Sequence, residues 1–142
     1  MYATLQDLKT LCGDEELIQL TDRADPPSGL IDEATTTAAL TAATHIIDGY
    51  VRAQYRLPLS SPVPMLTDLA ADIARYRLYK TAATEQVQKR FDDAIKQLVG
   101  ISKGLVKLPV ENGGDAEPAG RTGMVRIQSE PRTFSRTSMR GL

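Results

Sequence analysis

Three charged residues in one predicted helix have the types and spacing that acid–base chemistry or metal binding would need. Asp68 and Asp72 lie about one helical turn apart and Arg75 follows, so the three share one face of the helix. Paired carboxylates can transfer protons. The nearby arginine offers a simpler explanation, a charge network on the helix or between subunits. We therefore interpret these residues as candidate inter-subunit contacts and predict no catalytic residue.

The single histidine, His45, precedes Asp48 by three residues and could form a hydrogen-bonded pair with it on one helix. A catalytic histidine would need a nucleophile or a metal partner, and no such partner is evident in the sequence. We interpret His45 as a surface or interface residue. The single cysteine, Cys12, excludes an intrachain disulfide and is interpreted as a small buried residue.

The aspartates between residues 21 and 32 suggest a calcium loop, but their spacing does not fit one. Counted from Asp22, Ala24 and Pro26 occupy the third and fifth positions, where an EF-hand loop needs oxygen ligands. We predict a turn in which Asp32 caps the following helix, and no metal or cofactor. With no phosphate-binding glycine loop and no serine–histidine–acid arrangement, the sequence predicts a protein that is not an enzyme.

Apolar residues recur at helical spacing up to Ile101, which predicts an all-α bundle of four to five helices within a domain of residues 1–108. The central helix is expected at 64–80, because Pro64 suits a first helical position. Its apolar stripe places Ile73 in the core. The other expected helices cover residues 5–11, 14–20, 33–55 and 85–102.

The helix expected at 33–55 is rich in alanine and threonine, which would let other helices approach closely. Gly49 costs about 1 kcal/mol relative to alanine inside a helix, so we expect a packing reason for it. The prolines of residues 56–64 exclude a helix and favour a stiff extended connector.

The composition changes after residue 108. Residues 109–123 are polar and rich in glycine, which predicts a flexible linker, and 124–142 are expected to form an extended, partly β arm. We predict that this arm docks on another subunit. An open alternative is a basic tail that only neutralises DNA charge. The predicted partner-binding residues are Arg126, Arg132, Phe134, Arg136, Met139 and Arg140.

The whole chain carries a formal net charge of −1, so no overall field draws it to nucleic acid or a membrane. The first residues lack the basic start and apolar run of a signal peptide, so we expect synthesis in a cytoplasm. No predicted helix has the dense basic face of a DNA-recognition helix, although a DNA-binding protein stays an alternative.

Several blocks of sequence together resemble a family of small virion proteins from Mu-like phages and prophages, encoded among head and tail morphogenesis genes. The resemblance covers nearly the whole chain, and residues 46–59 and 72–79 are its most specific part. The loop at 22–32 departs from the pattern. The blocks are MYATLQDL at 1–8, ELIQLTD at 16–22, IIDGYVR at 46–52 with YRLPL at 55–59, DIARYRLY at 72–79, and RTFSR at 132–136 with MRGL at 139–142.

This family is similar in layout to the head–tail connector, or adaptor, proteins of long-tailed phages, which are helical bundles that form a ring, commonly of twelve copies. The resemblance implies a structural protein of the virion neck that extends the DNA channel. The implied partners are the portal, the adjoining neck, stopper or tail protein, and other copies of the chain. Genome DNA would pass through the channel without sequence-specific binding. A tail-completion or stopper protein and a small DNA-binding regulator stay as alternatives.

Overall fold

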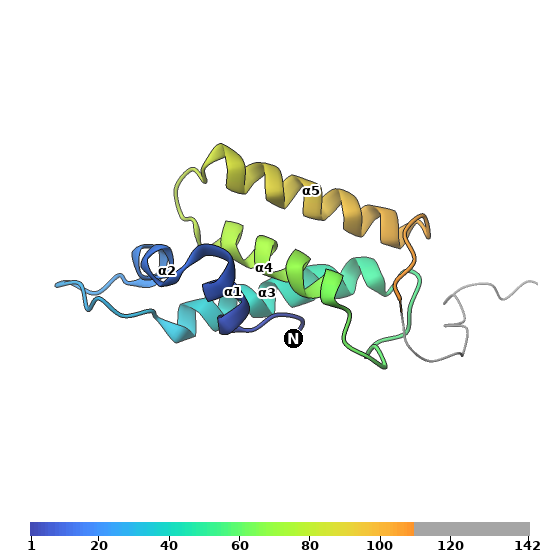
Figure 1. The fold of residues 1–142 in the computed structure, drawn as a ribbon, viewed down its shortest axis with the longest axis horizontal. Helices are drawn as coiled ribbons and strands as arrows, with labels where there is room; N and C mark the ends of the chain where they lie inside the picture. The colour runs from blue at the N-terminus through green and yellow to red at the C-terminus, as the bar shows by residue number, and fades with distance from the viewer. Residues whose placement is uncertain (110–142) are drawn as a thin grey trace, which may run out of the picture.

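The computed structural model describes residues 1–109, and these form a bundle of five α-helices (Figure 1). No strand occurs among the described residues, and the prediction of an all-α fold is confirmed. The predicted arm at 124–142 and the domain boundaries at 108 and 123 depend on residues beyond 109 and stay predictions. The helices are α1 (Leu5–Cys12), α2 (Asp14–Thr21), α3 (Glu33–Val51), α4 (Pro64–Leu78) and α5 (Glu85–Ser102).

Side-chain caps determine where three of these helices begin. Thr4 and Asp7 form a reciprocal capping box at the start of α1. The carboxylate of Asp32 accepts the backbone N–H groups of Ala34 and Thr35 at 2.9 and 3.3 Å, as the sequence predicted. The hydroxyl of Thr84 caps α5 in the same way. These short polar side chains satisfy donors that the first helical turn leaves without partners.

The helix α4 lies at the centre of the bundle and contacts α1, α3 and α5. Figure 1 shows it between α3 and α5. Ile73 is fully buried, which confirms its predicted place in the core. On the side facing α5, the rings of Tyr76 and Phe91 stack with centroids 4.1 Å apart. The buried residues of α4 are Leu66, Leu69, Ala70, Ala71, Ile73, Ala74 and Leu78.

The helix α3 ends at Val51, earlier than the sequence predicted. Residues 52–55 form a turn, and two of their side chains bind the end of α5 and the segment that follows it. Gln54 donates its side-chain amide to the carbonyl of Ser102 at 3.0 Å, and the Tyr55 hydroxyl accepts the backbone N–H of Leu108 at 3.0 Å. The turn keeps its own backbone bonds, such as that from the N–H of Tyr55 to the carbonyl of Val51 at 2.9 Å, and its side chains join it to the end of α5 and the segment beyond.

The packing reason expected for Gly49 is not found. Gly49 is exposed, and a Cβ placed there would meet nothing within 4 Å. The glycine therefore does not mediate close packing of α3 within the described fold.

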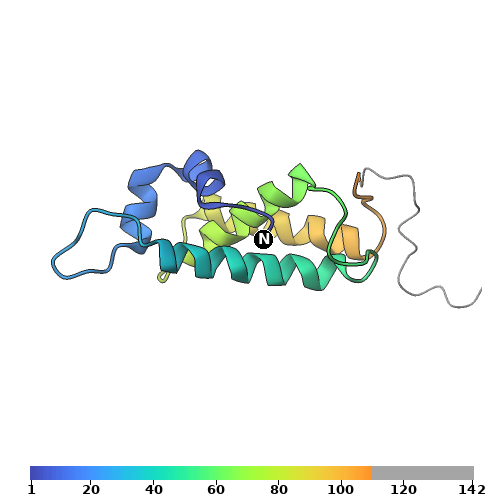
Figure 2. The same ribbon diagram turned by 90° about the horizontal axis from the view of Figure 1, so that it is seen from below.

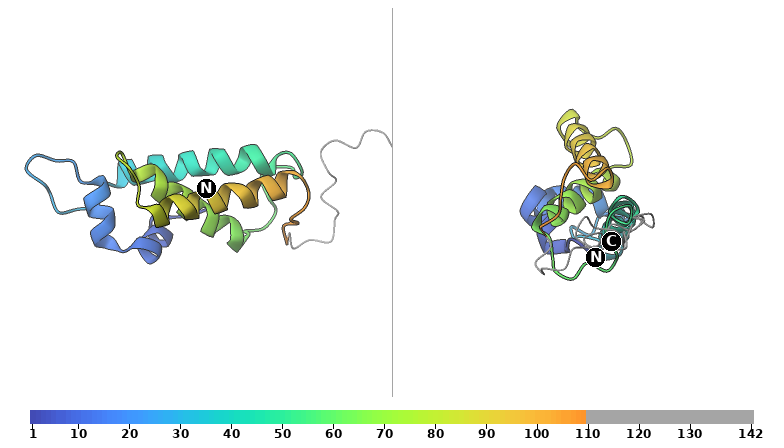
Figure 3. Two further views of the ribbon diagram at one scale, coloured as in Figure 1. Left: turned by 90° about the horizontal axis from the view of Figure 1, so that it is seen from above. Right: turned by 90° about the vertical axis from the view of Figure 1, so that its right-hand side faces the viewer.

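The described body is elongated, with irregular segments at opposite ends. Figures 2 and 3 show the loop 22–32 projecting at one end, while the connector 56–63 and residues 104–109 lie together at the other. No helix among residues 1–109 is long and apolar enough to cross a membrane.

Candidate functional site

The three charged residues that the sequence singled out in α4 do not pair with one another. Arg75 pairs with Glu16 of α2, and Asp72 pairs with Arg90 of α5, each at 2.8 Å. Asp68 is exposed and makes no ion pair within residues 1–109. The charge network therefore links α4 to two other elements of the same chain. A role of these residues between subunits stays a prediction.

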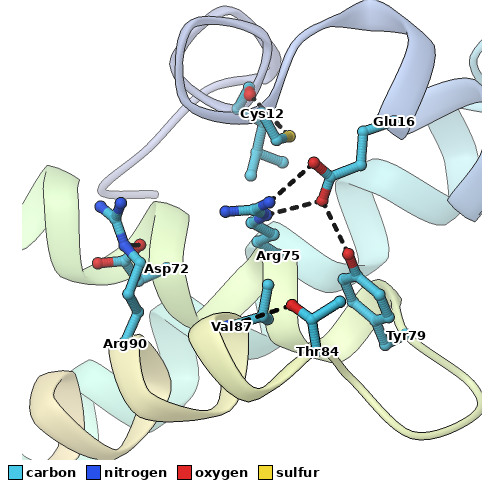
Figure 4. Close-up of polar contacts among 9 residues, drawn as sticks. Cys12, Glu16, Asp72, Arg75, Tyr79, Thr84, Val87 and Arg90 are labelled. Carbon is cyan, nitrogen blue, oxygen red and sulfur yellow. Dashed lines mark hydrogen bonds and ion pairs between the residues drawn. The ribbon is translucent and has the colours of Figure 1, made fainter.

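The Arg75–Glu16 pair joins α4 to α2, and the hydroxyl of Tyr79 also binds the Glu16 carboxylate (Figure 4). Arg75 donates Nε and Nη2 to the two oxygens of Glu16 at 2.8 Å each, and the Tyr79 hydroxyl donates to the same carboxylate at 3.0 Å. The side chains of Arg75 and Glu16 are only 15% and 25% exposed. In this bidentate arrangement the Glu16 carboxylate accepts three hydrogen bonds, two from Arg75 and one from Tyr79.

The protonation states around this pair favour a structural role. The hydrogen bonds that Arg75 donates to Glu16 raise the pKa of Arg75 above its ordinary value. Burial, and then the hydrogen bond to Glu16, raise the pKa of Tyr79. Both groups therefore keep their protons at neutral pH, whereas a general acid or base needs a pKa near the working pH. The cluster joins α2 to α4 through side chains that are charged or hydrogen-bonded to one another.

The thiol of Cys12 lies next to this cluster but is not activated by it. Its Sγ donates to the carbonyl of Leu8 at 3.0 Å, and the side chain is half-buried. Burial, more than the nearby charge of Glu16, raises the pKa of the Cys12 thiol to about 11. Since the thiolate is the nucleophile, Cys12 is unreactive at neutral pH.

The predicted His45–Asp48 pair is not formed. His45 is exposed, and Asp48 instead accepts a hydrogen bond of 2.6 Å from the hydroxyl of Tyr2. Burial and the bond to Asp48 raise the pKa of Tyr2, which therefore stays protonated. This bond joins the N-terminal segment to α3.

Two aspartates of the loop 22–32, Asp22 and Asp32, bind backbone N–H groups and not a shared site. The carboxylate of Asp22 accepts the N–H groups of Gly29 and Ala24 at 2.7 and 3.2 Å, and Asp32 caps α3. Across residues 1–109, no three histidine, cysteine, aspartate or glutamate side chains gather as a metal site would require. The loop is held as a turn by these bonds.

The predicted docking residues cannot be placed in this geometry. They lie outside the described residues, so their roles stay predictions. They are Arg126, Arg132, Phe134, Arg136, Met139 and Arg140.

Sequence reasoning missed Glu16 and Tyr2 as partners of α4 and α3. Glu16 resembles any acidic residue in the first turn of a helix, which suits the positive end of the helix dipole. Its partner is 59 residues away and Asp48 is 46 residues from Tyr2, so no local spacing indicates either contact.

Comparison with known proteins gives a consistent result. Residues 2–127 match the model of the family described as bacteriophage Mu Gp36. The chain is 33% identical over 135 residues to "Gene product J" of Escherichia phage Mu, covering 95% of this chain and 94% of that protein. It is 34% identical over 104 residues to the "Mu-like prophage FluMu protein gp36" of Haemophilus influenzae, covering 67% of this chain and 74% of that protein.

Proposed function

The chain belongs to the bacteriophage Mu Gp36 family, and from that membership we propose that it is a structural virion protein, a head–tail connector. The observation that carries the proposal is the match to a phage protein along nearly the whole chain, in a small helical bundle. A further support comes from Asp72 and Arg75, two charged residues of α4 that could have been catalytic. Both form ion pairs that join α4 to other helices.

The proposed working form is a ring, commonly of twelve copies in connector proteins, around a channel for duplex DNA. Contacts between copies need surface that the monomer core does not use. Asp68 offers an exposed carboxylate that makes no ion pair within residues 1–109, and it is the first candidate for a contact across subunits. The exposed side of α3 offers small side chains that permit close approach. Its exposed residues include Ala34, Thr37, Ala38, His45 and Gly49.

The proposed partners are the portal on one side of the ring and the adjoining neck, stopper or tail protein on the other. The C-terminal arm supplies one of these contacts through Phe134 and its flanking arginines, since aromatic residues and arginine dominate interface energies. The protein is made in the bacterial host and resides in the virion neck. Genome DNA passes through the ring without sequence-specific contacts.

Imaging of the particle tests this proposal directly. Cryo-electron microscopy of virions with this gene intact and of particles lacking it should differ by one ring at the head–tail junction. Purified protein should bind isolated portal rings. A neck that contains one or two copies of this protein, or none, contradicts the connector proposal.

The alternatives predict different binding. A tail-completion or stopper protein binds the ends of tail tubes and not the portal. A regulator binds duplex DNA with sequence selectivity and with affinity that falls steeply as salt rises. Binding assays with portal rings, tail tubes and duplex DNA at two salt concentrations therefore separate the three.

A further inference from the structure

The elongated body carries opposite charges at its two ends. Residues 14–33, which form α2, the loop 22–32 and the start of α3, contain seven acidic side chains and one basic one. Two of the acidic side chains pair with basic residues of α1 and α4. Arg77 and Lys80 line a pocket beside α3 and offset the remaining charge only in part. We call residues 14–33 the acidic end.

The opposite end of the body is basic. Residues 52–63 and 103–109 contain four basic side chains and no acidic one, and we call these residues the basic end. The bonds that residues 54 and 55 make to residues 102 and 108 hold the two segments together, so that the cations gather there (Figure 3). All four are exposed, and none forms an ion pair within residues 1–109. They are Arg52, Arg56, Lys103 and Lys107.

The acidic end presents an exposed leucine on a hydrogen-bonded loop. Leu30 is 70% exposed. The carboxylate of Asp22 accepts the N–H of Gly29 at 2.7 Å, and the hydroxyl of Ser28 accepts the N–H of Leu30 at 3.3 Å. Since these bonds already order the loop, packing of Leu30 against another molecule costs little conformational entropy.

The basic end contains a groove with apolar side chains in its lining. The groove has a volume of about 540 Å³ and lies between the N-terminus, α3 and the connector 56–63. Met1, Leu57 and Leu59 contribute to the lining, and Arg52 lies beside them. An apolar group and unpaired charges therefore occur together at both ends, and the charges are of opposite sign.

We propose that copies of this chain associate head to tail, with Leu30 of one copy packed in the groove at the basic end of the next. The acidic side chains around Leu30 then lie close to the arginines around the groove. Contacts between two like ends would bring like charges together, which is unfavourable. Charge therefore selects the contact between unlike ends.

This contact has a consequence for assembly. Because the two surfaces differ, each copy keeps one surface free after the first contact, and the contact can repeat until the copies close into a ring. The inference rests on the ring of the proposed function and assigns the two surfaces that join its copies.

Two full-length variants with reversed charges test the proposal. Asp25→Lys/Glu33→Lys changes two exposed carboxylates of the acidic end, and Arg52→Glu/Arg56→Glu changes two cations of the basic end. Each variant alone places like charges against one another, so its Kd for self-association should rise about tenfold or more. In an equal mixture the reversed ends face opposite charges again, and association should recover. Sedimentation velocity at low salt measures the Kd.

The matched control is Asp92→Lys/Asp93→Lys, which makes the same change of net charge on exposed residues in the middle of α5 and should associate like wild type. Leu30→Ser removes the apolar contact without changing charge and should also raise the Kd about tenfold. Circular dichroism should show an unchanged helical fold in every variant, because all the substituted side chains are exposed.

Three results overturn the proposal. One is a wild-type chain that stays monomeric at millimolar concentration and low salt. Another is a mixture of the two charge variants that associates no better than either variant alone. The third is a loss confined to Arg52→Glu/Arg56→Glu that appears only in duplex DNA binding, because the occupant of the basic end is then DNA.

Failure of this inference differs from failure of the connector proposal. If the charge variants associate like wild type while virions still contain one ring of this protein, the connector proposal stands and other surfaces join the copies. If mixing restores association but particles lacking the protein have an unchanged neck, the head-to-tail contact stands and the connector proposal fails.

Discussion

Arg75 in α4 and Glu16 in α2 form a bidentate ion pair, with two hydrogen bonds of 2.8 Å between side chains 59 residues apart. Replacing Glu16 by glutamine leaves a largely buried guanidinium without its counter-charge. We expect the Glu16→Gln change to lower the free energy of unfolding by about 1–3 kcal/mol. Urea denaturation followed by circular dichroism measures this loss.

The matched control for that change is Asp93→Asn. Asp93 pairs with Lys96 at 3.2 Å, but their side chains are 50% and 76% exposed, so the loss should stay below about 0.5 kcal/mol. Equal losses in the two variants would show that the buried pair contributes no more than a surface pair.

Asp32 should make stability depend on acid pH. The side chain of Thr35, together with backbone N–H groups, lowers the pKa of the Asp32 carboxyl below its ordinary value. A lowered pKa in the folded state stabilises the fold above the unfolded pKa of about 3.9, and the stabilisation disappears as pH falls through the folded pKa. Asp32→Asn keeps a capping side chain. We therefore expect it to be less stable than wild type at pH 7, and the difference to shrink at pH 3 in urea denaturation. A difference that does not change with pH would contradict this assignment.

Ile73→Ala should remove packing at the centre of the bundle. Ile73 is fully buried in α4, so the cavity and the lost apolar contact should cost about 2–5 kcal/mol in urea denaturation. Asp68→Ala changes the exposed side of the same helix and should alter stability by no more than about 0.5 kcal/mol. A loss under 1 kcal/mol for Ile73→Ala would place this residue outside the core.

The same substitution at two glycines should have opposite effects. Gly49 is helical and exposed with open space around it, so Gly49→Ala should raise stability by about 0.5–1 kcal/mol. Gly13 also has open space, but its φ of +82° is costly for alanine, so Gly13→Ala should lower stability by about 1 kcal/mol. Thermal and urea denaturation of the pair measure both signs. A loss of stability in Gly49→Ala would indicate a constraint on that position within the bundle.

The predicted docking arm depends on Phe134 and on residue order. A hot-spot aromatic contributes about 2 kcal/mol or more, so Phe134→Ala should weaken binding to the partner about 30-fold. Incorporation into particles should fall for this variant and for a chain with residues 121–142 scrambled. Scrambling keeps the arginines, so a tail that only neutralises DNA charge would tolerate both changes.

The sequence predicted those features of the fold that depend on local chemistry. The cap at Asp32 and the proline at the start of α4 act within one helical turn, so their effects follow from neighbouring residues. The buried position of Ile73 follows from the helical periodicity of the apolar residues. The outcome at each of these positions therefore agrees with the prediction.

Contacts between distant elements could not be predicted in the same way. Arg75 has Asp72 one turn before it, which suggested a local network, but the tertiary fold brings Glu16 of α2 to Arg75 instead. The last turn expected for α3 is instead a turn at residues 52–55, where Gln54 binds the end of α5 and Tyr55 binds the segment after it. These outcomes depend on which helix faces meet, which periodicity does not specify.

The bonds that Gln54 and Tyr55 make to residues 102–108 have a mechanical consequence. A pull on residue 109 first loads the bond between Leu108 and Tyr55, and then the bond between Gln54 and Ser102 at the end of α5. The tension is therefore shared between α5 and the turn after α3. This sharing opposes unwinding of α5 from its C-terminal end. The anchorage allows the end of the chain to bear load while the bundle keeps its shape.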